Sequence, residues 1–220
     1  MRKDALVNGQ VYHIISRSIA GYRIFSDDNC FSRMLNAIRF YNFPGTKISY
    51  SKFLLQSPKS QTELLESLQE SQCSNIVSYV LMPTHIHLTL QQLIEGGISK
   101  SMNNMLNSYS RYFNIRFKRK GPLWETRFKS ILVESDEQLL HLTRYQHLNP
   151  TSAGLVDKTE EWKWSSYNEY INNNDANRIC NFTDLLDIDP KEYQKFVNDR
   201  VAYQKEISKI KHLLSEDYTG

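Results

Sequence analysis

The apolar residues of this chain follow two spacings, and each spacing predicts a different kind of element. Over four short stretches they alternate with polar residues or run without a break, as they do in β-strands. The strands are expected at residues 10–17, 76–82, 86–93 and 127–133. Pro83 separates the second strand from the third, because proline cannot donate a hydrogen bond to a sheet.

In other stretches the apolar residues recur every three or four positions, which predicts amphipathic helices. A first helix begins near Ser26 and stops at Phe43-Pro44-Gly45, and a second covers residues 99–119. A third begins at Ser135, a good N-cap residue, and ends at Asn149-Pro150. Strands and helices in this order predict an α+β fold, in which helices pack on an antiparallel sheet. Many unrelated functions occur on this architecture, so the fold alone does not indicate an activity.

The length and composition support one hydrophobic core with an appended segment. The chain has 220 residues, of which 40% are hydrophobic. Residues 46–74 are rich in Ser and Gln and carry a short helical pattern of leucines, which indicates an inserted surface segment. A polar helical pattern follows from about residue 190 to residue 214. We therefore expect a domain at residues 1–172, with an insertion at about 46–74, and a helical C-terminal extension at residues 173–220.

The cysteines and the apolar runs indicate the compartment. Cys30, Cys73 and Cys180 are odd in number and form no Cys-x-x-Cys pair, which fits a reducing environment and small buried side chains. No apolar run approaches the roughly 20 residues of a membrane helix, and the N-terminus lacks the apolar segment of a signal peptide. We expect a cytoplasmic protein without a membrane partner.

The net charge of +3 is modest, but the basic residues are unevenly distributed. Between residues 111 and 129 seven cations accompany one acid, Glu125, with aromatic residues among them. Cations beside flat aromatic faces suit a single-stranded nucleic acid, whose backbone must be neutralised and whose bases can stack. The alternative is a solvated helix face with aromatic side chains in the core. The candidate DNA-binding residues are Arg111, Arg116, Lys118, Arg119, Lys120, Arg127 and Lys129.

Two histidines one residue apart, His85 and His87, lie at the start of the third predicted strand. Side chains at positions i and i+2 of a strand point to the same face, so the two imidazoles are expected side by side. Neutral imidazole is a common ligand of divalent metals, and two such ligands leave coordination positions open. The alternative is a pair of inert, hydrogen-bonded histidines at a strand end.

A second group of polar residues lies on the third predicted helix. His141, Tyr145 and Asn149 are spaced four apart, so they share one face of that helix and drift by about 40° at each step. If this face packs near the histidine strand, Asn149 would complete a metal site and Tyr145 would lie beside a bound phosphate. The alternative is a tyrosine at the rim of the core and an asparagine that merely ends the helix before Pro150.

Several motifs resemble those of a known family. Residues 82–88, Met-Pro-Thr-His-Ile-His-Leu, resemble the histidine-hydrophobic-histidine motif of the HUH nucleases, in the form found in single-tyrosine transposases. Residues 121–130 resemble the strand segment that follows in those proteins. Residues 144–156, followed by Trp-Ser-Ser-Tyr at 164–167, are similar to the REP-associated tyrosine transposases (RAYT). Together with an opening strand and a helix cap, the matches span roughly residues 9–170 in the right order.

The resemblance implies an enzyme with a ferredoxin-like or RRM-like HUH nuclease core, which cleaves and rejoins single-stranded DNA, usually at a hairpin, through a covalent 5′-phosphotyrosine. It implies that His85 and His87 hold Mg²⁺ or Mn²⁺ and that Tyr145 is the nucleophile. Related transposases place glutamine one turn after the tyrosine as a third ligand, where this chain has the shorter Asn149. Thr84 also departs from the motif, which more often has asparagine.

Other assignments remain open at the level of sequence. His141 is a candidate for proton transfer, and His13 is a candidate second-shell group for the histidine pair. Tyr109 and Tyr112, which also lie among cations, are rival nucleophiles. The alternative functions are a hairpin-binding protein that no longer cuts and a metal phosphodiesterase in which water attacks. Related transposases form dimers that exchange the tyrosine helix, and the RAYT branch is associated with monomers, so both a monomer and a homodimer are compatible with the chain.

Overall fold

A computed structural model describes residues 6–68, 72–172 and 178–200 of the chain. Its centre is a four-stranded sheet in the order β2-β3-β1-β4, in which all neighbouring strands are antiparallel. The four predicted strands are confirmed, with bounds that differ by one or two residues. The strands are β1 (Val11–Arg17), β2 (Ser74–Met82), β3 (His85–Gln92) and β4 (Lys129–Val133).

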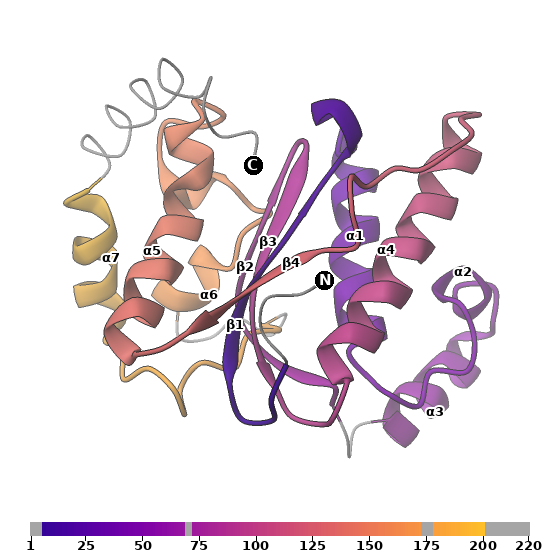
Figure 1. The fold of residues 1–220 in the computed structure, drawn as a ribbon, viewed down its shortest axis with the longest axis horizontal. Helices are drawn as coiled ribbons and strands as arrows, with labels where there is room; N and C mark the ends of the chain where they lie inside the picture. The colour runs from indigo at the N-terminus through magenta and orange to yellow at the C-terminus, as the bar shows by residue number, and fades with distance from the viewer. Residues whose placement is uncertain (1–5, 69–71, 173–177, 201–220) are drawn as a thin grey trace.

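Helices cover both faces of the sheet, and Figure 1 shows the two layers on either side of the strands. On one side lie α1 (Asp28–Tyr41) and α4 (Gly97–Arg116), which pack against each other. On the other side lie α5 (Asp136–Ser152), α6 (Tyr167–Ile171) and α7 (Pro190–Asn198). The predicted α+β fold with helices on an antiparallel sheet is therefore confirmed. Two single turns of 3-10 helix, Ile19–Gly21 and Thr159–Glu161, complete the structure.

The predicted starts of α1 and α5 are confirmed because their capping residues act as the sequence indicates, whereas α4 begins at Gly97, two residues before its predicted start. The side chain of Asp27 accepts a hydrogen bond from the Cys30 backbone N–H, at 3.0 Å, and so caps α1. Ser135 does the same for α5, since its hydroxyl accepts from the Gln138 N–H at 3.2 Å. Each cap satisfies a backbone donor that the first helical turn leaves without a partner.

The predicted end of α5 at Asn149-Pro150 is wrong, because the helix continues through Pro150 to Ser152. Pro150 lies in the last turn, where its missing N–H removes only one backbone hydrogen bond. The chain turns out of the helix at Gly154, whose φ of +68° is the left-handed conformation that glycine adopts readily. The Leu155 N–H then closes the turn on the Pro150 carbonyl at 2.9 Å.

The predicted end of the second helix at residue 119 is also too late, since α4 ends at Arg116. Lys118 has a φ of +51°, which is incompatible with a continuing right-handed helix. The Arg119 N–H bonds to the Asn114 carbonyl at 2.8 Å and closes a turn there.

The insertion predicted at about residues 46–74 folds as two short helices, α2 (Tyr50–Phe53) and α3 (Pro58–Leu68). Most of α3 is exposed, as expected of a surface segment. By contrast, Tyr50 and Phe53 are buried and their rings contact Phe40 of α1. The segment is therefore anchored to the core through these rings, and Leu68 at the end of α3 is buried as well.

The part of the C-terminal extension that the structure describes is packed on α5 and α6 through α7. Its buried side chains join the same hydrophobic cluster as the rest of the molecule; they are Cys180, Phe182, Leu186, Tyr193 and Val197. The helical pattern predicted beyond residue 200 lies outside the described residues, and the domain boundary after residue 172 stays a prediction. All three cysteines are buried and free, as predicted. None of the described helices has the length and apolar character that a bilayer crossing requires.

Candidate active site

The predicted pairing of His85 and His87 on one face of a strand is confirmed. Both lie on β3, where their ring centroids are 5.0 Å apart. In the neighbouring strand β1, Arg17 is opposite His85 and Ile15 is opposite His87. Residues opposite each other in adjacent strands point to the same face, so these four side chains share the face of the sheet that α5 covers.

Each imidazole of the pair is oriented by a hydrogen bond to its Nδ1 atom. The Nδ1 of His85 lies 2.9 Å from the hydroxyl of Thr84, and the Nδ1 of His87 lies 2.9 Å from the Nε2 of His13. The prediction that His13 supports the histidine pair from the neighbouring strand thus agrees with the geometry. In the described residues no hydrogen bond engages the Nε2 atom of either His85 or His87. With Nδ1 protonated, each Nε2 carries the lone pair that a metal ligand requires.

Burial keeps these histidines neutral. It lowers the pKa of His85 to about 4, assisted by the positive charge of Arg17, and lowers the pKa of His13 to about 4. Burial lowers the pKa of His87, which is 3% exposed, well below the usual value, and the positive charge of a second imidazolium or of Arg17 nearby would also repel its protonated form. An imidazole must be neutral to bind a metal ion. The pair is therefore in the ligand-competent protonation state at neutral pH.

The tyrosine predicted as nucleophile lies beside the histidine pair. Tyr145 projects from α5, and its ring meets the ring of His87 edge-on, with the centroids 6.0 Å apart. The side chain is 37% exposed, so its phenol is accessible to a substrate. The sequence made this site conditional on the helix of Tyr145 packing near the histidine strand. The structure shows that packing.

Gln146, the next residue along α5, fixes the helix over the sheet. Its Oε1 accepts from the hydroxyl of Ser78 on β2 at 2.6 Å, and its Nε2 donates to the hydroxyl of Thr89 on β3 at 2.9 Å. All three side chains are fully buried, and Ser78 and Thr89 are opposite each other in the sheet. Sequence reasoning missed this residue, because its partners lie 68 and 57 positions away.

Asn149 follows Tyr145 by one turn on the same face of α5. Its Nδ2 is buried and has no hydrogen-bond partner among the described residues. Side-chain amide nitrogen and oxygen atoms are interchangeable by rotation, so an unsatisfied amide can equally present its oxygen. An amide whose buried atom lacks a partner can serve as a ligand of a hard cation, and the role of Asn149 as a ligand stays a prediction.

His141 is exposed on α5, and its ring is oriented by contacts with neighbours on α5 and α7. Its Nδ1 accepts from the guanidinium of Arg144 at 2.7 Å, and its ring lies 5.6 Å from that of Phe196. Arg144 itself stacks on Phe196, with its central carbon 3.9 Å from the ring centroid. The role of His141 in proton transfer stays a prediction.

The rival nucleophiles lie on the other side of the sheet. Tyr109 is fully buried in α4, and its hydroxyl donates to the Ile24 carbonyl at 2.7 Å. Burial raises its pKa well above the usual value. Tyr112 is half-buried, and its hydroxyl accepts from Arg116 at 2.6 Å. Both phenols are part of the α1–α4 packing, as their helical spacing indicates for Tyr109.

The predicted DNA-binding residues divide into two groups. Arg127 and Lys129 are exposed, while Phe128 between them is buried. Lys129 is opposite Ile15, so it lies on the histidine face of the sheet. The second group lies at the end of α4 and in the turn after it, and comprises Arg111, Arg116, Lys118, Arg119 and Lys120.

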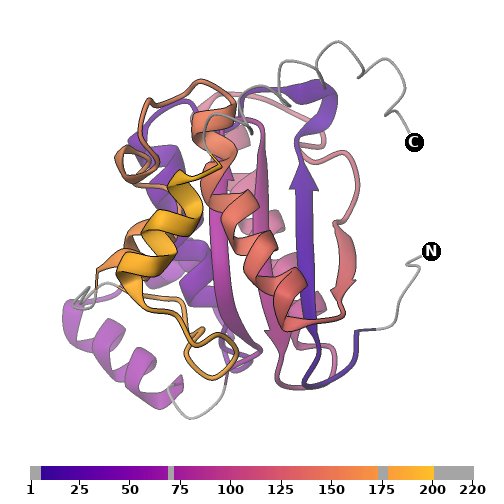
Figure 2. The same ribbon diagram turned by 90° about the vertical axis from the view of Figure 1, so that its left-hand side faces the viewer.

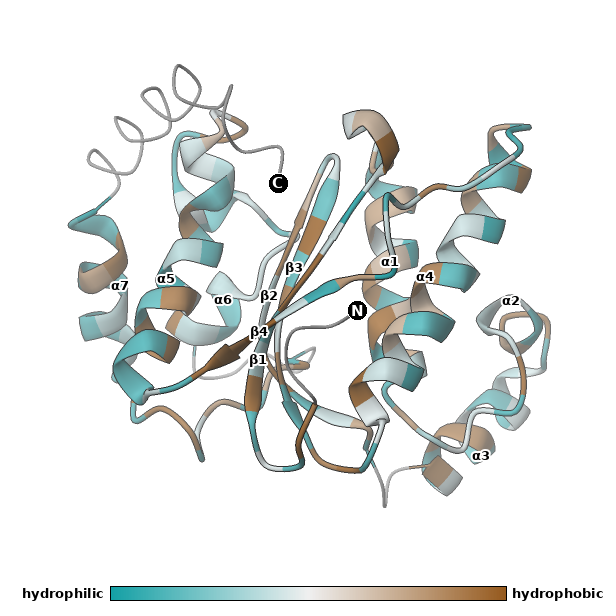
Figure 3. Ribbon diagram, viewed as in Figure 1, coloured by the Kyte–Doolittle hydropathy of each residue, from teal (hydrophilic) through white to brown (hydrophobic). Residues whose placement is uncertain are grey.

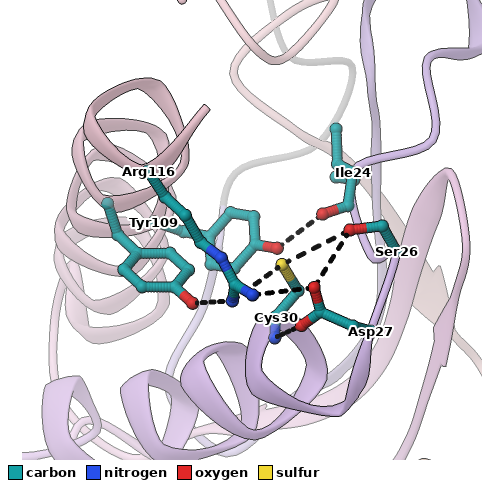
Figure 4. A network of polar contacts seen from close by, with 7 residues as sticks. Ile24, Ser26, Asp27, Cys30, Tyr109 and Arg116 are labelled. Atoms are coloured by element: carbon teal, nitrogen blue, oxygen red, sulfur yellow. Dashed lines mark hydrogen bonds and ion pairs between the residues drawn. The ribbon is translucent and has the colours of Figure 1, made fainter. Parts of the chain in front are cut away.

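Within the second group, Arg116 already has an acidic partner. Figure 4 shows its guanidinium between Asp27 and the end of α4. Its Nη2 lies 2.8 Å from the Asp27 carboxylate, and its Nη1 donates to Tyr112 and lies 3.7 Å from the Cys30 sulfur. This network joins the first turn of α1 to the last turn of α4. DNA binding by the seven cations stays a prediction, and Arg116 is the member with the clearest structural role.

A further cation that sequence reasoning missed lies beside the histidines. Arg17 is exposed at the end of β1, opposite His85. α5 packs over β2, and Figure 2 shows β1 uncovered next to it. On this open half Ile131 is 53% exposed, and Figure 3 shows the end of β4 as a hydrophobic segment. The histidine pair therefore borders an exposed part of the sheet face. This part carries the apolar side chain of Ile131 and the cations Arg17 and Lys129.

Among the residues that the structure describes, no group of three or more His, Cys, Asp and Glu side chains is arranged to hold a metal ion. The candidate ligand set of this site differs from such a group, because it combines two imidazoles with an amide. The roles of Tyr145, His85, His87 and Asn149 as site residues stay predictions, and their geometry agrees with them.

Comparisons with known proteins agree with the motifs. The family described as "Transposase IS200 like" matches residues 47–147. A protein of Haemophilus influenzae, provisionally named as a REP-associated tyrosine transposase, is 28% identical over 106 residues, which cover 43% of this chain and 60% of that protein. A solved structure of a REP-associated tyrosine transposase bound to a REP hairpin aligns with a TM-score of 0.51 and 15% identity, over 86% of this chain and 98% of that one. The resemblance to REP-associated tyrosine transposases and the predicted fold class are both confirmed.

Proposed function

We propose that this chain is a metal-dependent single-tyrosine transposase, an endonuclease that cuts and rejoins single-stranded DNA at a hairpin through a covalent 5′-phosphotyrosine. The edge-on contact between Tyr145 and His87 carries the proposal, because it brings a phenol to a pair of neutral imidazoles whose Nε2 atoms have no hydrogen bond among the described residues. The transposase-like sequence matches support the reaction class. The hairpin in the related solved structure supports hairpin DNA as the partner.

In this proposal His85, His87 and Asn149 hold Mg²⁺ or Mn²⁺. The two available Nε2 atoms, the low pKa values of the imidazoles and the unpartnered Asn149 amide fit such an ion. When bound, the cation polarises the phosphate and stabilises charge on its oxygen atoms. Thr84 and His13 hold the imidazole rings in the required orientation through their contacts to Nδ1.

Tyr145 supplies the nucleophile. Its phenolic oxygen forms a bond to phosphorus while the bond from phosphorus to the 3′ oxygen breaks. The departing oxygen takes the electron pair and a proton and becomes a 3′-hydroxyl, and the phenol loses its proton to a base. His141 is the proposed acceptor through Nε2, since Arg144 occupies its Nδ1. Attack by another 3′-hydroxyl on the phosphotyrosine restores a phosphodiester without ATP.

The open half of the histidine face is the proposed path of the single strand. Arg17 and Lys129 would neutralise phosphates of a strand that passes over the exposed apolar side chain of Ile131. The exposed basic residues at the end of α4 would contact further phosphates of the same DNA strand. Because Tyr145 and the histidines come from one chain, a monomer contains the whole constellation. Both a monomer and a homodimer remain compatible with this arrangement, and the proposal includes a cytoplasmic location and the predicted domain boundaries.

A covalent-trapping experiment separates this proposal from its alternatives. The protein is incubated with hairpin-bearing single strands and Mn²⁺, and the products are separated after boiling in detergent. A protein–DNA adduct supports the tyrosine mechanism. Cleavage without an adduct supports a metal phosphodiesterase in which water attacks, and tight binding without cleavage supports a hairpin-binding protein that no longer cuts.

A further inference from the structure

A groove lies on the layer of the molecule opposite α5, between α4 and the inserted segment. Its volume is about 490 Å³. Figure 1 shows α2 and α4 together, on the side of the sheet away from α5. Two walls, from the insertion and from one stripe of α4, contribute the polar lining, with Lys47 and Ser51 facing Asn104, Asn107, Ser108 and Arg111.

The groove is positively charged. Lys47 and Arg111 are both exposed cations, and none of the described lining residues is acidic. The remaining polar lining is made of amides and hydroxyls, which can donate hydrogen bonds to an anion. The ion pairs formed among the described residues use neither Lys47 nor Arg111, so their charges are available to a ligand.

A third cation lies behind the wall of the groove. Arg33 is 9% exposed and donates from Nη2 to the hydroxyl of Ser51 at 2.7 Å. Its guanidinium lies over the rings of Tyr50 and Tyr112, at 4.4 and 5.1 Å. Its Nε is buried without a hydrogen-bond partner, and in the described part of the chain no carboxylate pairs with it. A buried charge without a counter-ion is costly, so an anion supplied from outside would stabilise it.

We propose that this groove binds the phosphodiester backbone of the DNA, outside the segment that Tyr145 cuts. The inference rests on the proposed function, because it assigns a second contact to the same substrate. From Asn104 to Arg111 the α4 wall extends about 10 Å, which matches two or three successive phosphates of a helical strand. Amides, hydroxyls and cations on this wall suit phosphate and sugar rather than base edges. The site therefore positions DNA on the molecule without reading its sequence.

The double variant Lys47→Gln/Arg111→Gln tests the groove. Both side chains are exposed, so the variant keeps the fold, which circular dichroism verifies. The probe is a labelled library of hairpin-bearing single strands with a fixed stem and randomised flanks, and binding is followed by fluorescence anisotropy at several salt concentrations. We expect roughly tenfold weaker binding and a salt slope that is smaller by about two. Lys59→Gln/Lys195→Gln is the matched control, since it removes two exposed charges that lie outside the groove and leaves affinity unchanged.

Parallel trapping of the covalent adduct separates this inference from the proposed function. If the double variant binds the library with wild-type affinity and salt slope, the groove does not hold DNA, even where the adduct still forms. If the wild type forms no adduct but the double variant shows the loss of binding, the groove inference stands and the proposed chemistry fails. A loss of binding equal to that of Lys59→Gln/Lys195→Gln would overturn the inference, because it would reflect net charge alone.

Discussion

The Nε2 atom of His13 on β1 lies 2.9 Å from the Nδ1 atom of His87 on β3, and the two rings stack with their centroids 5.1 Å apart. This contact is diagonal across the sheet, because His13 is opposite Thr89 in the register. His13 can accept this hydrogen bond only when Nδ1 of His87 carries the proton. In that tautomer the lone pair on Nε2 of His87 is available to a ligand.

His13→Phe removes the acceptor and keeps an aromatic ring in its place. We expect the apparent affinity for Mn²⁺ to fall roughly tenfold to a hundredfold, because His87 loses the group that fixes its tautomer. Calorimetric titration of the protein with Mn²⁺ measures this change. His13→Gln, whose amide oxygen can accept the same hydrogen bond, recovers part of the affinity. Wild-type affinity in His13→Phe would show that the contact does not orient His87.

Gln146→Leu tests how α5 is fixed over the sheet. The change leaves the hydroxyls of Ser78 and Thr89 buried without their partner, at a cost of roughly 2–4 kcal/mol in the free energy of unfolding. Urea unfolding measures the loss. The triple variant Ser78→Ala/Thr89→Val/Gln146→Leu replaces every partner with an apolar group and is expected to recover most of the stability. A single variant as stable as the wild type would contradict the role of this hydrogen-bonded bridge.

Asn149→Ala removes the third proposed ligand. We expect a roughly tenfold or greater loss of apparent Mn²⁺ affinity and a matching loss of adduct at low metal concentration. Asn149→Gln restores a side-chain amide and is expected to retain metal-dependent adduct formation. Equal metal dependence in Asn149→Ala and the wild type would remove Asn149 from the ligand set.

Arg17→Gln removes the cation opposite His85. The charge is expected to contribute to phosphate binding beside the histidines, so the rate of adduct formation should fall roughly tenfold or more. Arg17→Lys keeps the charge and should recover part of the rate. Lys195→Gln, an exposed position on α7, is the control for net charge. Equal rates for Arg17→Gln and Lys195→Gln would show that Arg17 has no specific role.

The sequence predicts those parts of the site that depend on local spacing. His85 and His87 share a face because the side chains of a strand alternate between its two faces. Tyr145 and Asn149 share a face because residues four positions apart lie on the same side of a helix. Arg17 and His13 lie beside the histidine pair because of the register in which β1 pairs with β3. That register cannot be predicted from a local sequence pattern. The same limit applies to Gln146, whose hydrogen bonds join distant segments.

The end of α5 shows a second limit of the sequence. Asn149-Pro150 matches a stop signal, yet tertiary packing of the helix on β2 carries it on to Ser152. Asn149 consequently presents its amide from within the helix rather than from a turn. In the described part of the extension, buried tyrosine and phenylalanine side chains likewise lie in a sequence pattern that is polar and charged as a whole.

The most direct test of the central claim is the site of the covalent bond. Wild-type protein, Tyr145→Phe and Tyr112→Phe are incubated with hairpin-bearing single strands and Mn²⁺, and adducts are quantified after denaturing electrophoresis. We expect an adduct from the wild type and from Tyr112→Phe, its complete loss in Tyr145→Phe, and its loss from all proteins when EDTA removes the metal. An adduct that persists in Tyr145→Phe would contradict the assignment of the nucleophile and, with it, the proposed tyrosine mechanism.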